Sequence, residues 1–362
     1  MIQMSRPTFG PEEESAVLDV MRSGQFAQGE RVREFERAFA LATGAEYGVA
    51  TSSGTTALFL ALRAHGVGPG DEVITSPLTF IATANAIVHA GAVPVFADVD
   101  ESLGLSVVAV ARLIGPRTRA LLPVHLHGNP CDLPSLIELA ARHGVAVIQD
   151  ACQAVGAEVA GRRLGTHGTA VYSFYATKNL TTGEGGMVTT NDPRVADLCA
   201  ALRHQAYAGP AYVHDRVGYN FRMTELQAAI GLVQLGRLAA ITARRRLIAS
   251  YYDEAIGDAR FARPATLPDA CHVYHQYTLR LAAENGDARQ ERDRLRASLA
   301  EAGVATGVYY PVPVHRQPAY ERYAASSCPR AERASEDMFS IPVHHALSDA
   351  EVETVAQAVA AL

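Results

Sequence analysis

The 362-residue chain is long enough for two domains, because single hydrophobic cores rarely grow beyond about 250–300 residues. Its 48% hydrophobic and 19% charged residues describe a globular protein and exclude a disordered or fibrous one. The net charge of −6 lacks the basic character typical of nucleic-acid-binding proteins. The five scattered cysteines favour neither a disulfide framework nor a metal site.

The sequence also predicts a cytoplasmic protein. No apolar run approaches the roughly 20 residues that cross a bilayer. The first residues lack the basic and then apolar layout of a secretion signal. We therefore expect small-molecule substrates, with neither a membrane nor a nucleic acid as partner.

Helices and strands are expected to alternate over the first half of the chain. Helical apolar spacing predicts helices at residues 12–22 and 31–42, each ending near a glycine. Short apolar runs then predict strands at 47–50, 72–75, 93–97, 120–124, 145–149, 170–174 and 187–190. Several of these runs lack an alternation of apolar and polar residues, as is typical of parallel strands that helices cover on both faces. The pattern predicts a doubly wound α/β sheet.

The second half predicts more helix and a smaller unit. Helices are expected at 194–206, 224–238 and 237–256, and Thr224 and Gln227 fit a capping box at the start of the second. From about residue 270 a smaller α/β pattern follows, with a strand at 274–281 and helices at 288–302 and 349–361. We therefore expect a large domain over residues 1–240 and a small domain over 241–362.

The sequence contains a single lysine, which makes this residue a candidate for a specific role. Of the 32 lysine and arginine residues, only Lys178 is a lysine. The base composition of a genome can explain a shortage of lysine, but it does not explain the one that is kept. Arginine cannot form an imine with an aldehyde, whereas lysine can once its pKa is lowered. Lys178 follows an expected strand and precedes a glycine-rich turn, so it is a candidate for this role.

Other polar residues follow the expected strands, where doubly wound sheets bind ligands. Gly54 and Thr55 open a helix whose free amides and dipole can bind phosphate, and Ser173 lies five residues before Lys178. Asp150 ends an apolar strand, where a carboxylate can keep a pyridine nitrogen protonated. Phe80 can stack on a flat ring. Each also has an ordinary interpretation, as a helix cap or a core residue.

Five segments resemble one known family. TSSGTTAL, PLTFIATAN, QDACQAVGA, SFYATKNLTTGEGGM and GYNFRMTELQAAIG are similar to the DegT/StrS-type sugar aminotransferases, which are pyridoxal-phosphate (PLP) enzymes of fold type I. The resemblance covers nearly the whole chain. It implies PLP as cofactor, a large PLP domain with a mostly parallel sheet flanked by helices, and a smaller C-terminal α/β domain. One branch of the family has histidine in place of Lys178 and acts as a deoxysugar dehydratase.

The resemblance also implies roles for individual residues. Lys178 would form the Schiff base, with Asp150 at the pyridine nitrogen and Gln153 at the ring hydroxyl. The resemblance implies that Gly54, Thr55 and Ser173 bind the phosphate and that Phe80 stacks on the ring. It implies that Tyr310 and His315 contact the substrate. Asn220 resembles the residue that reaches the phosphate of the neighbouring subunit, which implies a homodimer with shared active sites.

The implied reaction moves an amino group from L-glutamate to a keto-sugar in amino-sugar biosynthesis. The run at 181–186, which contains Glu184, resembles branches that act on nucleotide-linked 4-keto-6-deoxyhexoses. A C3 keto-sugar and an aminocyclitol ketone of the scyllo-inosose type are alternatives. Outside this class, a PLP-dependent dehydratase and a non-catalytic regulator remain. A nicotinamide oxidoreductase is disfavoured, because no G-x-G-x-x-G follows the first strand.

Overall fold

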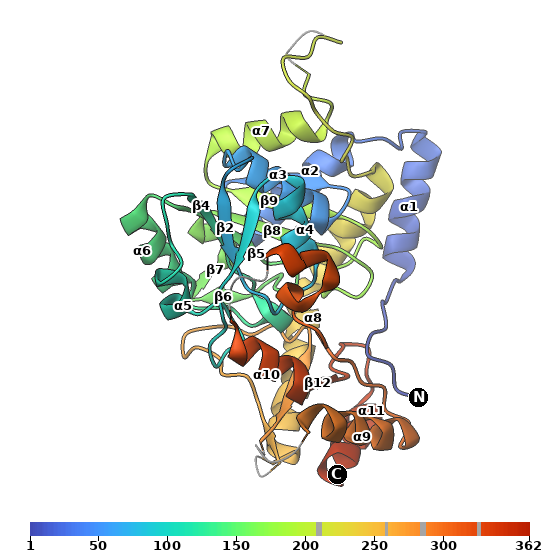
Figure 1. Ribbon diagram of the computed structural model, residues 1–362. Helices are drawn as coiled ribbons and strands as arrows, with labels where there is room; N and C mark the ends of the chain where they lie inside the picture. Colours follow the sequence, from blue (N-terminus) through green and yellow to red (C-terminus); the bar gives the residue numbers. More distant parts are fainter. Residues whose placement is uncertain (208–211, 258–259, 283–286, 324–326) are drawn as a thin grey trace.

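A seven-stranded sheet forms the centre of the larger of two units (Figure 1). The computed structural model describes residues 1–207, 212–257, 260–282, 287–323 and 327–362. In spatial order the strands are β1 (Tyr47–Thr51), β9 (Gly186–Thr190), β8 (Thr169–Ser173), β5 (Ala146–Asp150), β4 (Thr118–Leu122), β2 (Glu72–Thr75) and β3 (Val93–Phe96). Only β9 is antiparallel to its neighbours. The predicted mostly parallel α/β sheet is confirmed.

Helices cover both faces of this sheet because successive strand residues point to opposite sides. In β8, Tyr172 packs into the core shared with α2 (Glu30–Thr43), α6 (Leu133–His143) and α8 (Glu225–Ala255). The preceding Val171 packs into the core shared with α3 (Gly54–Ala64), α4 (Ala82–His89) and α7 (Pro193–Arg203). Two further helices, α1 (Pro11–Ser23) and α5 (Val107–Ala111), and a small hairpin, β6 (Glu158–Val159) with β7 (Arg162–Arg163), complete this unit.

Helix α8 joins the two units as one continuous helix, where the sequence predicted two. Thr224 Oγ1 accepts a hydrogen bond from the amide of Gln227 at 3.3 Å, so the predicted capping box is confirmed. Among the described residues, α8 is the one helix that is long and apolar enough by composition to cross a membrane. Its first turns pack against α1 and α2, and Ile248 and Tyr252 enter the core of the small unit. The predicted domain boundary at residue 240 falls inside it.

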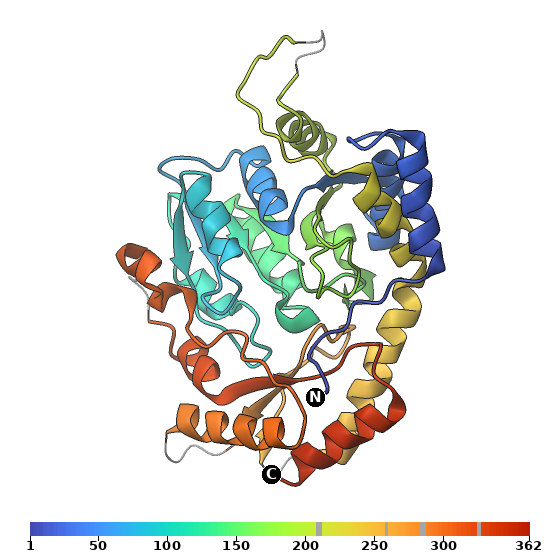
Figure 2. The same ribbon diagram turned by 90° about the vertical axis from the view of Figure 1, so that its right-hand side faces the viewer.

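The smaller unit is a three-stranded antiparallel sheet of β10 (Phe261–Ala262), β11 (Tyr277–Leu281) and β12 (Met338–Ile341), with α9 (Ala288–Glu301) and α11 (Asp349–Ala360) beside it. The sequence interpretation missed β12 and the preceding α10 (Pro329–Asp337). The chain crosses between the units more than once. Residues 314–323 and 327–338 contribute side chains to a core shared with the large unit. The N-terminal end lies beside the small unit (Figure 2), where Ile2 pairs with Val304.

Candidate active site

A cavity of about 620 Å³ opens at the carboxyl ends of the central strands. The last residues of β5 and β8 line it, and so does the start of α3 just after β1, as expected for a doubly wound sheet. Within the described chain, most of the predicted site residues line this one cavity: Gly54, Thr55, Phe80, Asp150, Gln153, Ser173, Lys178 and Tyr310. The fold therefore brings residues that lie more than 250 positions apart in the sequence, such as Gly54 and Tyr310, to the same cavity.

The start of α3 forms a seat for an anion. Ser53 caps the helix by accepting a hydrogen bond from the Thr56 amide at 3.2 Å. The amides of Gly54 and Thr55 have no acceptor within the described residues, and they point along the positive end of the helix dipole. A Cβ on Gly54 would lie only 2.8 Å from Ser173 Cβ, so glycine allows the helix end to approach Ser173. The arrangement fits a phosphate group.

Asp150 is a buried carboxylate at the end of β5, 5% exposed. Thr83 donates its hydroxyl to Oδ2 at 2.7 Å, and the Cys152 amide donates to Oδ1 at 3.1 Å. Thr79 lies 2.8 Å from Thr83, hydroxyl to hydroxyl. These contacts fix the orientation of the carboxylate. The sequence interpretation missed Thr83, although the spacing of four residues from Thr79 places both on one side of a helical turn.

Lys178 lies in the turn between β8 and β9, where its amide donates to Tyr175 O at 2.9 Å. Its Nζ makes no hydrogen bond or ion pair to any residue that the structure describes. Burial lowers the pKa of Lys178 from its ordinary 10.5, and the neighbouring Cys152 and Asp150 oppose this shift. The amine is therefore easier to deprotonate than a surface lysine, which is what imine formation requires.

The side chain of Gln153 connects two segments beside the cavity, one at His127 and one at Tyr310. Its Oε1 accepts from the amide of His127 at 2.7 Å, and its Nε2 donates to the Tyr310 hydroxyl at 3.1 Å. The side-chain amide is therefore held in one orientation. Burial raises the pKa of Tyr310, which keeps this hydroxyl protonated at neutral pH. Phe80 is 55% exposed within the cavity wall, with its ring centroid 5.9 Å from that of Tyr310.

Two predicted residues lie outside the cavity lining. His315 is 1% exposed, and its Nε2 lies 2.8 Å from Glu332 Oε1. Its ring packs beside Phe96 because the short helical turn at Val314–Arg316 directs it into the protein rather than toward Tyr310. Asn220 is exposed, paired by its backbone with His204, and its predicted contact with a neighbouring subunit stays a prediction.

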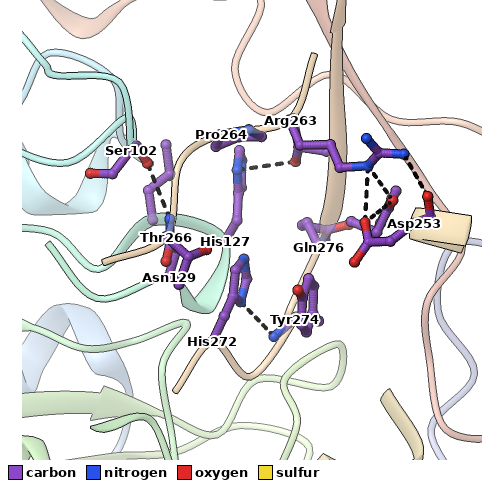
Figure 3. Close-up of a pocket in the computed structure, with 13 residues that line it drawn as sticks. Ser102, His127, Asn129, Asp253, Arg263, Pro264, Thr266, His272, Tyr274 and Gln276 are labelled. Atoms are coloured by element: carbon purple, nitrogen blue, oxygen red, sulfur yellow. Dashed lines mark hydrogen bonds and ion pairs between the residues drawn. The ribbon is translucent and has the colours of Figure 1, made fainter. Parts of the chain in front are cut away.

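A second cavity, of about 360 Å³, shares Gln276 with the first in its lining. Figure 3 shows the residues that line it. Arg263 donates to Tyr277 OH and pairs with Asp253, both at 2.9 Å. His272 and Tyr274 stack with their ring centroids 3.9 Å apart. None of the predicted site residues lines this cavity.

A helix-end anion seat, a fixed buried carboxylate and a lysine with a lowered pKa fit PLP, and together with the fold they define a PLP-dependent enzyme. Residues 7–360 match the DegT/DnrJ/EryC1/StrS aminotransferase family, and the chain belongs to that family. It is 40% identical over 359 residues to the pleiotropic regulatory protein of Geobacillus stearothermophilus, covering 97% of this chain and 94% of that one. It is 38% identical over 340 residues to the UDP-N-acetyl-3-dehydro-alpha-D-glucosamine 3-aminotransferase of Acidithiobacillus ferrooxidans, covering 93% and 90%.

The fold is also similar to those of solved aminotransferase structures. DesV of S. venezuelae superposes with a TM-score of 0.92 at 39% identity, covering 97% of this chain and 94% of DesV. The PLP form of the sugar aminotransferase Spr1654 of Streptococcus pneumoniae superposes with a TM-score of 0.93 at 29% identity, covering 99% and 98%. Spr1654 is also known in a PMP form. The protein is thus a sugar aminotransferase of this family, with PLP as its cofactor.

Proposed function

We propose that the protein transfers the amino group of L-glutamate to a nucleotide-linked keto-sugar, with Lys178 forming the Schiff base with PLP. The observation that carries this proposal is the meeting of Lys178, Asp150 and the free amides of Gly54 in one cavity. Each supplies a different requirement of the same cofactor: an amine for the aldehyde, a carboxylate for the ring nitrogen and donors for the phosphate.

When bound, PLP supplies an electron sink next to the transferred nitrogen. The amides of Gly54 and Thr55 and the hydroxyl of Ser173 bind its phosphate in this proposal, and Asp150 holds the ring nitrogen. Lys178 would hold the cofactor through its aldehyde carbon and, once its amine is free, would act as the general base that moves the proton from Cα of the donor to that carbon. The same amine returns a proton to the sugar carbon in the second half-reaction. Gln153, oriented by His127, donates to the ring hydroxyl.

The position of the ketone is the finer part of the proposal. The run around Glu184, which lines the cavity, favours a 4-keto-6-deoxyhexose. A 3-keto-sugar is a second candidate, favoured by the name of the Acidithiobacillus ferrooxidans relative. The two candidates differ in which carbon of the ring must reach Lys178.

A direct comparison of substrates tests both candidates. Purified enzyme loaded with PLP and glutamate is offered matched nucleotide-linked 4-keto and 3-keto hexoses, and the position of the new amine is read by NMR. Amination of the 4-ketone supports the first candidate, and amination of the 3-ketone alone supports the second. If glutamate is consumed with neither, while a cyclitol ketone is aminated, the nucleotide-sugar assignment is wrong.

We further propose a homodimer in which Asn220 reaches the phosphate in the neighbouring site. Asn220 is exposed and lies outside the cavity of its own chain, which is consistent with a role in another subunit. Mixing Lys178→Ala with Asn220→Ala tests this arrangement, provided that each variant alone has lost activity. Mixed dimers would regain about half of one enzyme's activity if one site receives both intact residues. Two independent sites would show no recovery.

A further inference from the structure

Residues 1–8, here called the amino-terminal strap, run from α1 across to the small unit (Figure 2). The first part of the strap is fastened to the small unit by backbone hydrogen bonds. Ile2 donates to Gly303 O at 2.7 Å, and the Ala305 amide donates to Ile2 O at 2.9 Å. His344 Nε2 lies 3.1 Å from Gln3 O. The path of the first three residues is therefore fixed.

The other end of the strap is fastened by side chains. Thr8 Oγ1 lies 2.7 Å from His345 Nε2, and Gln234 of α8 donates to Thr8 O at 3.1 Å. Arg6 pairs with Glu351 of α11 at 2.9 Å. The guanidinium of Arg6 is thus engaged with the small unit, and it is not among the residues that line the cavity.

Between these two fastened ends, Met4 and Ser5 line the active-site cavity. Both are half-buried. The Ser5 hydroxyl makes no hydrogen bond to any residue of the described ranges. The strap therefore presents to the cavity a thioether, an unpartnered hydroxyl and backbone groups, and it presents no cation.

We propose that the strap is the wall that recognises the acceptor sugar, with Ser5 hydrogen-bonding a sugar hydroxyl and Met4 packing on the apolar C–H face of the ring. Glutamate carries two carboxylates, which are bound most strongly by charged donors. A neutral polyhydroxylated ring matches the chemistry of the strap better, because hydroxyls pair with hydroxyls and flexible methionine adapts to C–H surfaces. This inference rests on the proposed sugar amination.

The two half-reactions separate the roles of donor and acceptor. Ser5→Ala and Met4→Ala are compared with Gln3→Ala, whose side chain contacts only Met1 O within the strap. Each PLP-loaded protein is first mixed with glutamate and then, after removal of glutamate, with the keto-sugar, and absorbance follows both steps. The loss of one neutral hydrogen bond is expected to lower kcat/KM for the keto-sugar by about 5- to 10-fold in Ser5→Ala. The rate with glutamate stays within about twofold, as it does for Gln3→Ala.

The outcomes are distinct. Equal losses in both half-reactions, or no loss with the sugar in either Ser5→Ala or Met4→Ala, would overturn the role of the strap. A wild-type protein that reacts with glutamate but with no keto-sugar would instead overturn the proposed function. Normal yield and melting temperature of the variants would show that a selective loss does not come from misfolding.

Discussion

The cavity has two halves that are built in different ways. On the cofactor half, Gly54, Asp150 and Ser173 lie at or just after the ends of three strands of one sheet, so the sheet itself sets their positions. The substrate half consists of the strap, His275 with Gln276, and Tyr309 with Tyr310, which come from three distant stretches of chain. Their positions depend on how the small unit packs against the large one. A site can therefore combine a half defined by local motifs with a half defined by tertiary contacts.

The largest effect is expected at Lys178, on the cofactor half. Lys178→Ala removes the only lysine and with it both the imine and the general base, so turnover should fall by at least about 1,000-fold. Lys178→Arg is the matched control, because it keeps the charge but cannot form an imine. Steady-state assays and the absorption spectrum after PLP addition measure both. Substantial turnover by either variant would contradict the role of Lys178.

The placement of the cofactor half could be predicted from the sequence because its residues follow strands whose ends can be located from apolar runs. Asp150 and Lys178 line one cavity, as this placement predicted, and their roles stay predictions. His315 shows the limit, because five residues after Tyr310 the chain turns inward and pairs with Glu332. The strap was not predicted, since nothing in the pattern of residues 1–8 shows that they cross to the small unit. Similarly, the two adjoining predicted helices are one helix, because neither Gly231 nor Gly236 interrupts α8.

The next effect is expected at two buried histidines, His125 and His127, in the stretch between β4 and α6. Burial lowers the pKa of each imidazole to about 4, from an ordinary 6.5. The unfolded chain takes up protons as pH falls below about 6.5, whereas the folded chain does so only near 4. The free energy of unfolding should therefore fall between these pH values, by up to ~3 kcal/mol per histidine.

Urea unfolding at intervals between pH 7 and pH 4 measures this dependence. His125→Asn should reduce its slope by up to one proton, or about 1.4 kcal/mol per pH unit. His143→Asn, at an exposed position, controls for the substitution itself. An unchanged slope in His125→Asn would show that this imidazole does not stay neutral in the folded protein.

A smaller effect tests the phosphate seat. In Gly54→Ala the new Cβ would meet Ser173 Cβ at 2.8 Å and Cys152 Sγ at 3.0 Å, which pushes the helix end away. Such overpacking typically costs 1–3 kcal/mol, so we expect PLP to bind about 10- to 100-fold more weakly. Gly236→Ala in α8 is the control, because no atom lies within 4 Å of the added carbon. Titration of the apo proteins with PLP measures both, and equal affinities would exclude the close approach at Gly54.

The smallest effect is expected at Thr83, and it sharpens the contrast between the halves. Thr83→Val keeps the shape but removes the 2.7 Å hydrogen bond to Asp150, so both half-reactions should slow by about 5- to 10-fold. Thr83→Ser restores a hydroxyl and should restore most of the rate. If Thr83 acts through Asp150 and the cofactor, as proposed, its loss should affect glutamate and keto-sugar alike, whereas Ser5→Ala should affect the keto-sugar alone. If Thr83→Val slowed only one half-reaction, the two halves of the cavity would not be functionally separate.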